Sequence, residues 1–155
     1  MFATNFERAF KNHETGIRLK FEYYDEANAD MQELAQSLAF NDEVYAVIGG
    51  LYSSNAAILA AELTLVGKTF FTLATTEQLV RAYASTGYLW AMTETDITQC
   101  EVLLSKVINY GGKSVALLAK DNDNYGQTFM DWFAFQAREL GLKNICLLYT
   151  SPSPR

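Results

Sequence analysis

The first third of the chain carries its apolar residues in two different spacings. Residues 17–23, "IRLKFEY", alternate apolar and polar side chains at every second position, which predicts a β-strand. Residues 28–40 instead place apolar side chains at helical spacing, with Asn28 or Asp30 available to cap the first turn. The run at 44–48, "VYAVI", is apolar throughout, which is typical of a strand that is buried on both faces.

The rest of the chain continues this alternation of strands and helices. Strands are predicted at 69–73 and 114–119, a short apolar segment at 88–92, and helices at 54–66, 97–110 and 127–140. Segments 74–78, "ATTEQ", and 120–126, "KDNDNYG", are predicted to be polar turns or loops. Strands that alternate with helices are typical of βαβ units, so the sequence predicts an α/β fold built on parallel sheets.

The chain changes character at "TETD", residues 93–96, which suggests two units. We expect an incomplete first unit at 1–93, a crossing at 94–96 and the start of a second unit at 97–145. The last ten residues, "CLLYTSPSPR", begin like another strand and then contain two prolines, which disfavour both helix and sheet. We therefore expect 146–155 to be a non-native or disordered tail, with a natural flexible terminus as the alternative.

Composition and charge narrow the classes of partner. The 155 residues carry a formal net charge of -6, and the lysines and arginines are scattered, so a nucleic-acid partner is not expected. No stretch approaches the ~20 continuous apolar residues of a membrane span. The first ten residues, "MFATNFERAF", lack the basic, apolar and small-residue order of a signal peptide.

Three polar loops follow predicted strands and are the candidates for chemistry. They are "GGLYSSN" at 49–55, "ATTEQ" at 74–78 and "KDNDNYG" at 120–126. In open parallel sheets, ligands bind beyond the carboxyl ends of the strands, so all three loops lie at a ligand-binding edge. The hydroxyls of Ser53 and Ser54 can donate hydrogen bonds, and the helix that begins there favours an anion such as a carboxylate.

Simpler interpretations of these loops remain open. Ser53 or Ser54 could act only as the N-cap of the helix, which stabilises it by about 1 kcal/mol. The hydroxyls of Thr75 and Thr76 could bond to their own backbone within a turn. Tyr125 could be an ordinary packed aromatic residue. The ligand-binding interpretation depends on the three loops sharing one edge.

Catalytic and metal-binding motifs are not recognisable. Cys100 and Cys146 are the only cysteines and lack the spacing of a zinc site, so each is expected to be a buried thiol. The single histidine, His13, is poorly placed to act as a base. Neither a phosphate-binding loop nor a hydrolase nucleophile motif surrounds Ser53. "DNDNYGQ" departs from a calcium loop at Tyr125. We expect no enzyme activity, no metal and no cofactor.

Five segments, in order and with compatible spacing, resemble a known family. They are "YYDEANAD", "VYAVIGGLYSSNA", "GKTFFTLATTEQL", "YLWAMTETDITQ" and "GGKSVALLAKDNDNYGQTF". From Gly16 to about Leu142 the chain resembles the type I periplasmic solute-binding proteins, in particular the branched-chain amino-acid and amide-binding group that serves ABC importers. The resemblance implies that fold, incomplete here, in which two lobes close on a solute by hinge motion.

The resemblance also implies roles for individual residues. Ser53 would bind the α-carboxylate of the solute through its hydroxyl or amide. The Ala74 carbonyl and the Thr75 hydroxyl would accept from the α-ammonium, and Thr75 would also reach the carboxylate. Tyr125 would close over the ligand from the second lobe. Tyr52 stands where some relatives have a disulfide cysteine, so that bridge is not expected. The expected ligand-binding residues are Ser53, Ala74, Thr75, Tyr125, Ser54 and Tyr52.

The function implied by this resemblance is that of an extracytoplasmic solute-binding subunit of an ABC importer. Its partners would be an amino acid or a related small carboxylate or amide, and a membrane ABC permease. We expect this chain to be a fragment that lacks a signal sequence, the first strand of lobe one and most of lobe two. Two alternatives are the ligand-sensing domain of a receptor or transcriptional regulator, and a small α/β enzyme.

Overall fold

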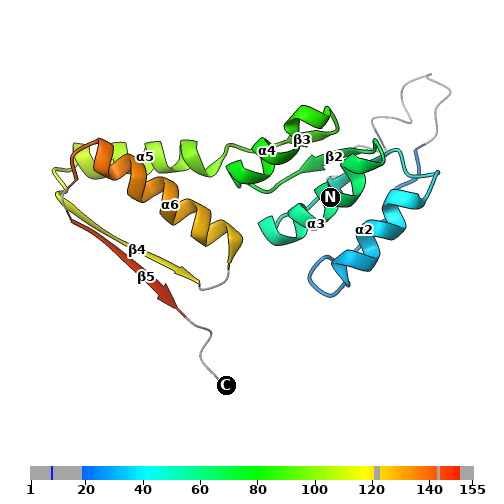
Figure 1. Cartoon of the computed structure of the whole chain (residues 1–155), viewed down its shortest axis with the longest axis horizontal. Helices are drawn as coiled ribbons and strands as arrows, with labels where there is room; N and C mark the ends of the chain where they lie inside the picture. The colour runs from blue at the N-terminus through cyan, green and yellow to red at the C-terminus, as the bar shows by residue number, and fades with distance from the viewer. Residues whose placement is uncertain (1–7, 9–18, 121–122, 143, 151–155) are drawn as a thin grey trace.

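Two parallel sheets lie at opposite ends of the molecule. The computed structural model describes residue 8 and residues 19–120, 123–142 and 144–150. One sheet has the order β1-β2-β3 and the other pairs β4 with β5, with every pair parallel. Figure 1 shows the two sheets one after the other along the long axis, with helix α5 leading from one to the other. Among the described residues, no helix is long and apolar enough to span a membrane.

The first unit comprises residues 31–91 and carries the three-stranded sheet. Its elements are α2 (Met31–Phe40), β1 (Ala46–Gly49), α3 (Ser53–Leu65), β2 (Thr69–Thr72), α4 (Glu77–Tyr83), the 3-10 turn η1 (Ala84–Thr86) and β3 (Leu89–Ala91). Its core lies between α3, α2 and the sheet, where Leu59, Leu63 and Phe70 are buried. In the sheet, Phe70 of β2 is aligned with Val47 of β1 and Leu89 of β3.

The second unit comprises residues 96–150. Its elements are α5 (Asp96–Asn109), β4 (Ser114–Lys120), α6 (Asn124–Glu139) and β5 (Asn144–Thr150). Its core is a smaller cluster in which Cys100 and Leu104 of α5 pack with Phe133 and Ala137 of α6. The two units, separated by residues 92–95, therefore have separate cores and separate sheets.

Side-chain contacts explain where α2 begins and ends. Asp30 accepts hydrogen bonds from the backbone amides of Gln32 and Glu33, which confirms Asp30 as the N-cap. At the other end, the Lys68 ammonium donates to the carbonyls of Leu38 and Asn41. A cation at the last carbonyls of a helix compensates groups that have no partner within the helix.

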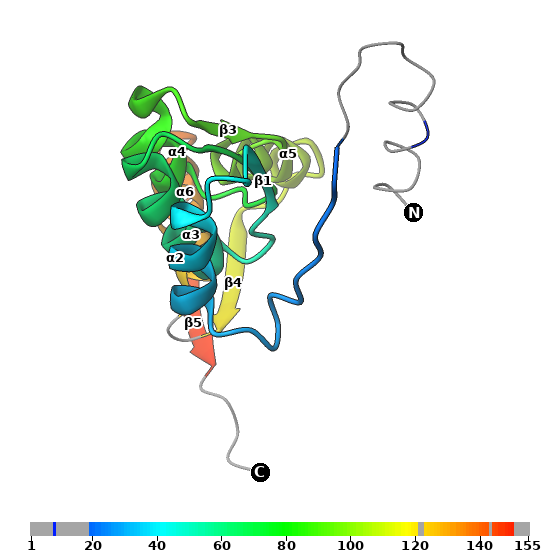
Figure 2. The same ribbon diagram turned by 90° about the vertical axis from the view of Figure 1, so that its right-hand side faces the viewer.

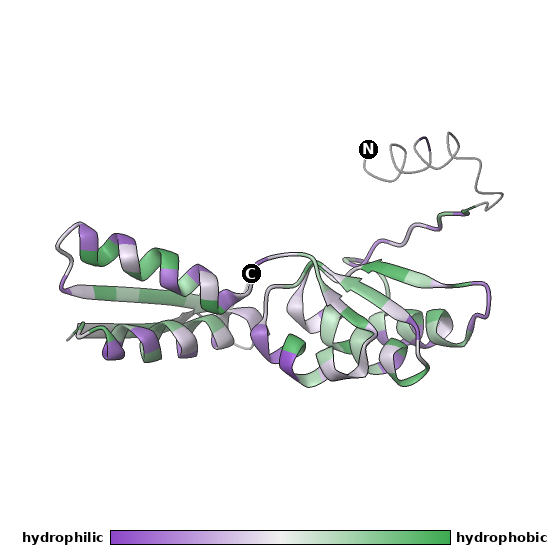
Figure 3. Cartoon of the chain, turned by 90° about the horizontal axis from the view of Figure 1, so that it is seen from above, coloured by the Kyte–Doolittle hydropathy of each residue, from purple (hydrophilic) through white to green (hydrophobic). Residues whose placement is uncertain are grey.

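One strand prediction, and the predicted burial of another strand, are wrong in this structure. Residues 19–24 belong to neither sheet, and Figure 2 shows them running apart from the sheet toward α2. Alternation shows only that a segment can present one apolar face, whereas a strand also needs a neighbour to pair with. The strand at 44–48 was expected to be buried on both faces, but Ile48 is 55% exposed. The helices of the first unit gather on one face of its sheet, as Figure 3 shows.

Three predictions near helix and chain ends are also wrong. Glu77 and Gln78 begin helix α4 rather than lying in a turn, and Tyr125 lies in the first turn of α6 rather than in a loop. Cys146 and the residues up to Thr150 pair with β4 as part of β5, so they are not disordered as expected. Cys146 is exposed, whereas Cys100 is buried as expected. The two prolines lie outside the described residues.

Candidate functional site

The loop after β1 turns sharply at Gly50. Its φ angle is +64°, in the left-handed region that favours glycine. A Cβ atom at this position would lie 3.0 Å from the Ala56 Cα and 3.0 Å from the Phe70 Cζ. Backbone conformation and close packing therefore both require glycine here, and the tight turn brings the start of α3 against the sheet.

Hydrogen bonds join this loop to the loop after β2. The Leu73 amide donates to the Gly49 carbonyl at 3.0 Å, which extends the pairing of β1 and β2 beyond the strands. The buried Thr72 hydroxyl donates to the Gly50 carbonyl at 3.4 Å and accepts from the Ala74 amide at 3.1 Å. The two loops are thus held together at the carboxyl edge, the end of the sheet where β1 and β2 finish.

The hydroxyl next to Ser53 is that of Thr76. Thr76 Oγ1 donates to Ser53 Oγ at 2.6 Å, and both side chains are buried. Sequence reasoning assigned Thr75 to this position and missed Thr76. The signal lies in the period of β2, which continues through the loop, because every second residue from Phe70 to Thr76 is buried, including Thr72 and Ala74. A role for the Thr75 hydroxyl stays a prediction.

The N-cap interpretation of the serines is wrong. Tyr52 is the N-cap residue of α3, its side chain makes no cap hydrogen bond, and Ser53 and Ser54 are the first helical residues. The Ser53 hydroxyl instead points to Thr76 across the two loops. The first-turn amides of α3 therefore have no side-chain cap, and such amides, with the helix dipole, favour an anion.

Glu26 supports the first loop from a distant part of the chain. Its carboxylate accepts from the Leu51 amide at 3.0 Å, and its carbonyl accepts from the Asn55 side-chain amide at 3.2 Å. Asp25 turns back on itself, because its carboxylate accepts from the Ala27 amide and the Asn28 side chain. Of these two adjacent acids, Asp25 therefore stabilises its own turn, whereas Glu26 fixes the loop after β1.

Asp96 supports the second loop in a similar way. Its amide donates to the Thr75 carbonyl at 2.8 Å, and its Oδ1 accepts from the Glu77 amide at 3.1 Å. Burial raises the pKa of the Asp96 carboxyl more than the amides of Glu77 and Ile97 lower it. The folded state therefore favours the protonated form, so this group lowers the free energy of unfolding as pH rises above the usual Asp pKa.

Tyr125 reaches the same region from the second unit. Its hydroxyl donates to the Gln99 side chain at 2.9 Å, and its ring packs on Phe129 with centroids 5.8 Å apart. Burial raises the Tyr125 pKa, and the charge of Asp96, one turn from Gln99, adds to this shift. Tyr125 is therefore linked through α5 to the residue that holds the second loop.

The remaining predicted residues differ in exposure. Ala74 is buried, Thr75 is half-buried, Ser54 is exposed and Tyr52 is 55% exposed. Burial raises the pKa of the Cys100 thiol to about 12, which keeps this thiol protonated at neutral pH. Across 19–120, 123–142 and 144–150, no cluster of His, Cys, Asp and Glu residues could hold a metal ion.

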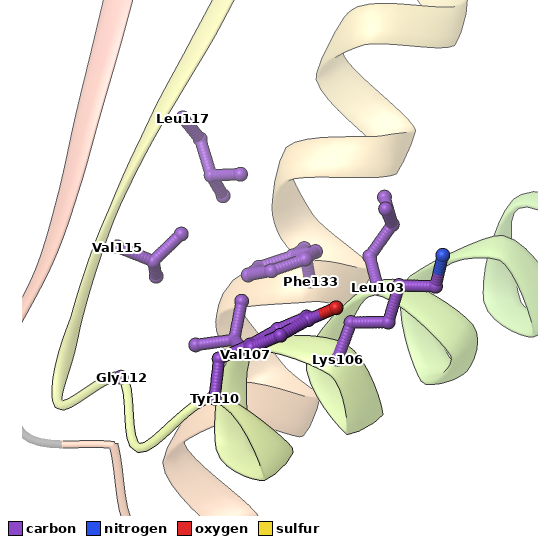
Figure 4. A pocket seen from close by; sticks show the side chains of 8 residues that line it. All are labelled: Leu103, Lys106, Val107, Tyr110, Gly112, Val115, Leu117 and Phe133. Carbon is purple, nitrogen blue, oxygen red and sulfur yellow. The ribbon is translucent and has the colours of Figure 1, made fainter.

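An apolar pocket of about 490 Å³ lies elsewhere, in the second unit. Figure 4 shows Val115 and Leu117 of β4 facing Phe133 of α6, with Val107 and Tyr110 of α5 beside them. This pocket opens beside the amino end of β4, opposite the edge at which parallel sheets bind ligands. We assign the candidate site to the polar carboxyl edge of the first sheet, because fixed polar groups are what orient a small ligand.

Comparison with known proteins shows the family of this chain. The sequence profile described as "Periplasmic binding protein" matches residues 6–153, whereas no curated protein matches. Among solved structures, the leucine binding protein LivK from Thermotoga maritima superposes with a TM-score of 0.82 at 16% identity, over 97% of this chain and 43% of its own.

Two other solved structures share the fold. The branched-chain amino acid transporter substrate binding protein LivJ from Streptococcus pneumoniae, in complex with isoleucine, has a TM-score of 0.78 and 20% identity over 98% of this chain and 43% of its own. A solute binding protein of an ABC transporter from Rhodopseudomonas palustris, in complex with 3,4-dihydroxybenzoic acid, has a TM-score of 0.78 and 19% identity over 95% and 40%. This chain thus spans less than half of each structure. It belongs to the periplasmic binding protein family and has the type I fold of that family.

Proposed function

We propose that this chain forms part of the solute-binding subunit of an ABC importer and that it binds an amino acid or a related small carboxylate. The observation that carries the proposal is the buried pair of hydroxyls, Ser53 and Thr76, at the carboxyl edge of the first sheet. The pair lies where the uncapped first turn of α3 begins. Hydroxyls and free amides that converge on one point suit a carboxylate, because a charged group that leaves water needs several hydrogen bonds.

The neighbouring groups suit the rest of an amino acid. Carbonyl groups of the second loop, including that of Ala74, can accept from an α-ammonium, and the Thr75 hydroxyl can add to them. Tyr125 comes from the second unit and can cover the ligand when the two units close. Tyr52 and Ser54 flank Ser53 on α3 and complete the proposed site.

The ligands of the structural neighbours support a carboxylate. Their structures hold leucine, isoleucine, 4-hydroxybenzoate or 3,4-dihydroxybenzoic acid. The carboxyl group is the one functional group that all four molecules share. We therefore propose that the carboxylate is what the loops at 49–55 and 74–78 recognise, and that other parts of the site select the remainder of the solute.

The rest of the proposed function concerns where the protein works. Several neighbours are named as substrate-binding or solute-binding proteins of ABC transporters. We propose by analogy that this protein acts outside the cytoplasm, delivers its solute to a membrane ABC permease and catalyses no reaction.

A binding experiment with matched solutes tests the proposal. Solutes that bind only the native state raise its melting temperature, so unfolding is followed with L-leucine, L-isoleucine and 4-hydroxybenzoate. The matched control is 3-methylbutylamine, which is leucine without its carboxylate. We expect at least one carboxylate solute to stabilise the protein while the amine does not. Equal effects of leucine and the amine, or no effect of any carboxylate solute, would contradict the proposal.

A further inference from the structure

Asp96 bonds to the backbone on both sides of Thr76. Its amide holds the Thr75 carbonyl at 2.8 Å, and its carboxylate holds the Glu77 amide at 3.1 Å. Thr76 lies between these two bonds, and its hydroxyl donates to Ser53. Asp96 itself is fully buried, so the second loop cannot move away without breaking two bonds inside the protein.

The position of Thr76 explains what these bonds achieve. Thr76 is the N-cap residue of α4, and a threonine there ordinarily turns its hydroxyl to an amide of its own helix. Here Thr76 makes no such bond, because its hydroxyl is directed at Ser53. The Asp96 carboxylate takes the first amide of α4 instead. Asp96 thus replaces Thr76 as the side-chain cap of α4, and the Thr76 hydroxyl can bond to Ser53 at the carboxyl edge.

We propose that Asp96 is a positioning residue for solute binding: it fixes residues 75–77 so that the Thr76 hydroxyl meets Ser53 and faces the solute. The proposal that this geometry serves a solute rests on the function proposed above. Asp96 does not itself touch the solute, since its Oδ2 is buried and makes no hydrogen bond within the described residues. Its effect passes through the loop.

Asp96 also connects the two units. It is the first residue of α5, the helix that leads into the second unit. One turn further along α5, Gln99 accepts from the Tyr125 hydroxyl. A continuous path of contacts therefore runs from Ser53 through Thr76 and Asp96 to Tyr125. We call the two bonds from Asp96 to Thr75 and Glu77 the clamp. Because Asp96 belongs to α5, the clamp moves with α5 when the units close, so closure and the geometry of the second loop are coupled.

Backbone amide exchange without solute tests the clamp. In the unchanged protein, the Glu77 amide should exchange about ten-fold more slowly than the Ser54 amide, which sits in a helix turn with no side-chain cap. Asp96→Ala should remove this protection, and Asp96→Asn should restore it, because asparagine keeps the acceptor oxygen. Should Asp96→Ala fail to fold, the unchanged protein and Asp96→Asn still decide the matter. Rapid exchange of Glu77 in the unchanged protein overturns the clamp.

Solute binding then tests the positioning role. The matched control is Asp30→Ala, which removes a side-chain cap from α2, where Asp30 bonds to Gln32 and Glu33. With L-leucine as the probe, Asp96→Ala should raise the Kd by about ten-fold, whereas Asp30→Ala should leave it unchanged at a similar loss of stability. Equal weakening by both variants overturns the positioning role. If no carboxylate solute binds the unchanged protein, the proposed function fails, while the exchange experiment still judges the clamp.

Discussion

The carboxyl ends of the first strands in the two units are built differently. In the first unit, the bonds at this edge join residues distant in sequence: Thr76 bonds to Ser53, Asp96 to Glu77, and Glu26 to Leu51. After β4 in the second unit, the described cap is local, since Asp123 accepts from the Gly126 amide three residues away. Within the described residues, the first edge therefore has these three side-chain bonds between distant residues, whereas the second combines a local cap with the long-range bond from Tyr125 to Gln99.

This difference indicates which edge is built in advance for a ligand. Long-range polar bonds order two loops before any solute arrives, and an ordered site loses less entropy when it binds. Tyr125, at the carboxyl edge of the second unit, is 37% exposed, and it can reach a bound solute by moving together with α6. The apolar pocket beside Val107 and Val115 lies at the opposite end of β4 and is lined mainly by apolar side chains.

The largest effect that we expect is on stability, from Gly50→Ala. The substitution combines a left-handed backbone, unfavourable for alanine by about 1 kcal/mol, with overpacking against Ala56 and Phe70, for a loss of about 2–4 kcal/mol. Gly141→Ala in the second unit is the control, because Gly141 has a φ of +82° but open space around it. Urea unfolding of both variants measures the difference. Equal losses would mean that the first loop is not tightly packed.

A smaller effect is expected at the hydroxyl pair. Ser53→Ala and Thr76→Val should each lower the free energy of unfolding by about 1–3 kcal/mol, because each leaves a buried partner without its bond. The double variant should lose less than the sum, since the two share one interaction. Tyr125→Phe, which removes an exposed bond to Gln99, should cost less than either. Full additivity in denaturant titrations would show that the two hydroxyls are not coupled.

The smallest effect is expected where the two units touch. The Arg81 guanidinium of α4 lies 5.4 Å from the ring centroid of Trp132 in α6, a cation–π contact of about 0.5–1 kcal/mol at an exposed site. Arg81→Gln should lower the melting temperature slightly, and Glu77→Gln, which removes the ion pair with Arg81 together with a negative charge near Asp96, should lower it less. If Glu77→Gln has the larger effect, Arg81 acts through the ion pair rather than through Trp132.

Much of the fold could be predicted because its signals are local. The caps and apolar spacing of α2 and the glycines after α3 and α6 lie within a few residues of the ends that they mark. The alternation that made residues 17–23 resemble a strand is also local, but pairing is not, and residues 19–24 join neither sheet. The prolines near the end likewise concealed the pairing of Cys146 with Ala116.

The candidate site could be predicted only in part, for the same reason. Ser53 was predicted from its loop, and Thr76 was within reach had the period of β2 been followed to its end. Asp96 could not be found, because its contact with Glu77 spans 19 residues and depends on how α5 packs against the second loop. The short helix α4 was missed with it, since its cap comes from outside its own segment.

The central claim is that a carboxylate solute binds at the carboxyl edge of the first sheet, and an NMR titration of the backbone amides tests it most directly. With L-leucine added to the labelled protein, we expect the largest shifts at the amides of Ser53 and Thr76, a smaller shift at Tyr125, and none at Val107 and Val115 beside the apolar pocket. The amine 3-methylbutylamine should leave Ser53 unshifted. The largest shifts at Val107 and Val115, with Ser53 and Thr76 unmoved, would contradict the claim and assign binding to the second unit.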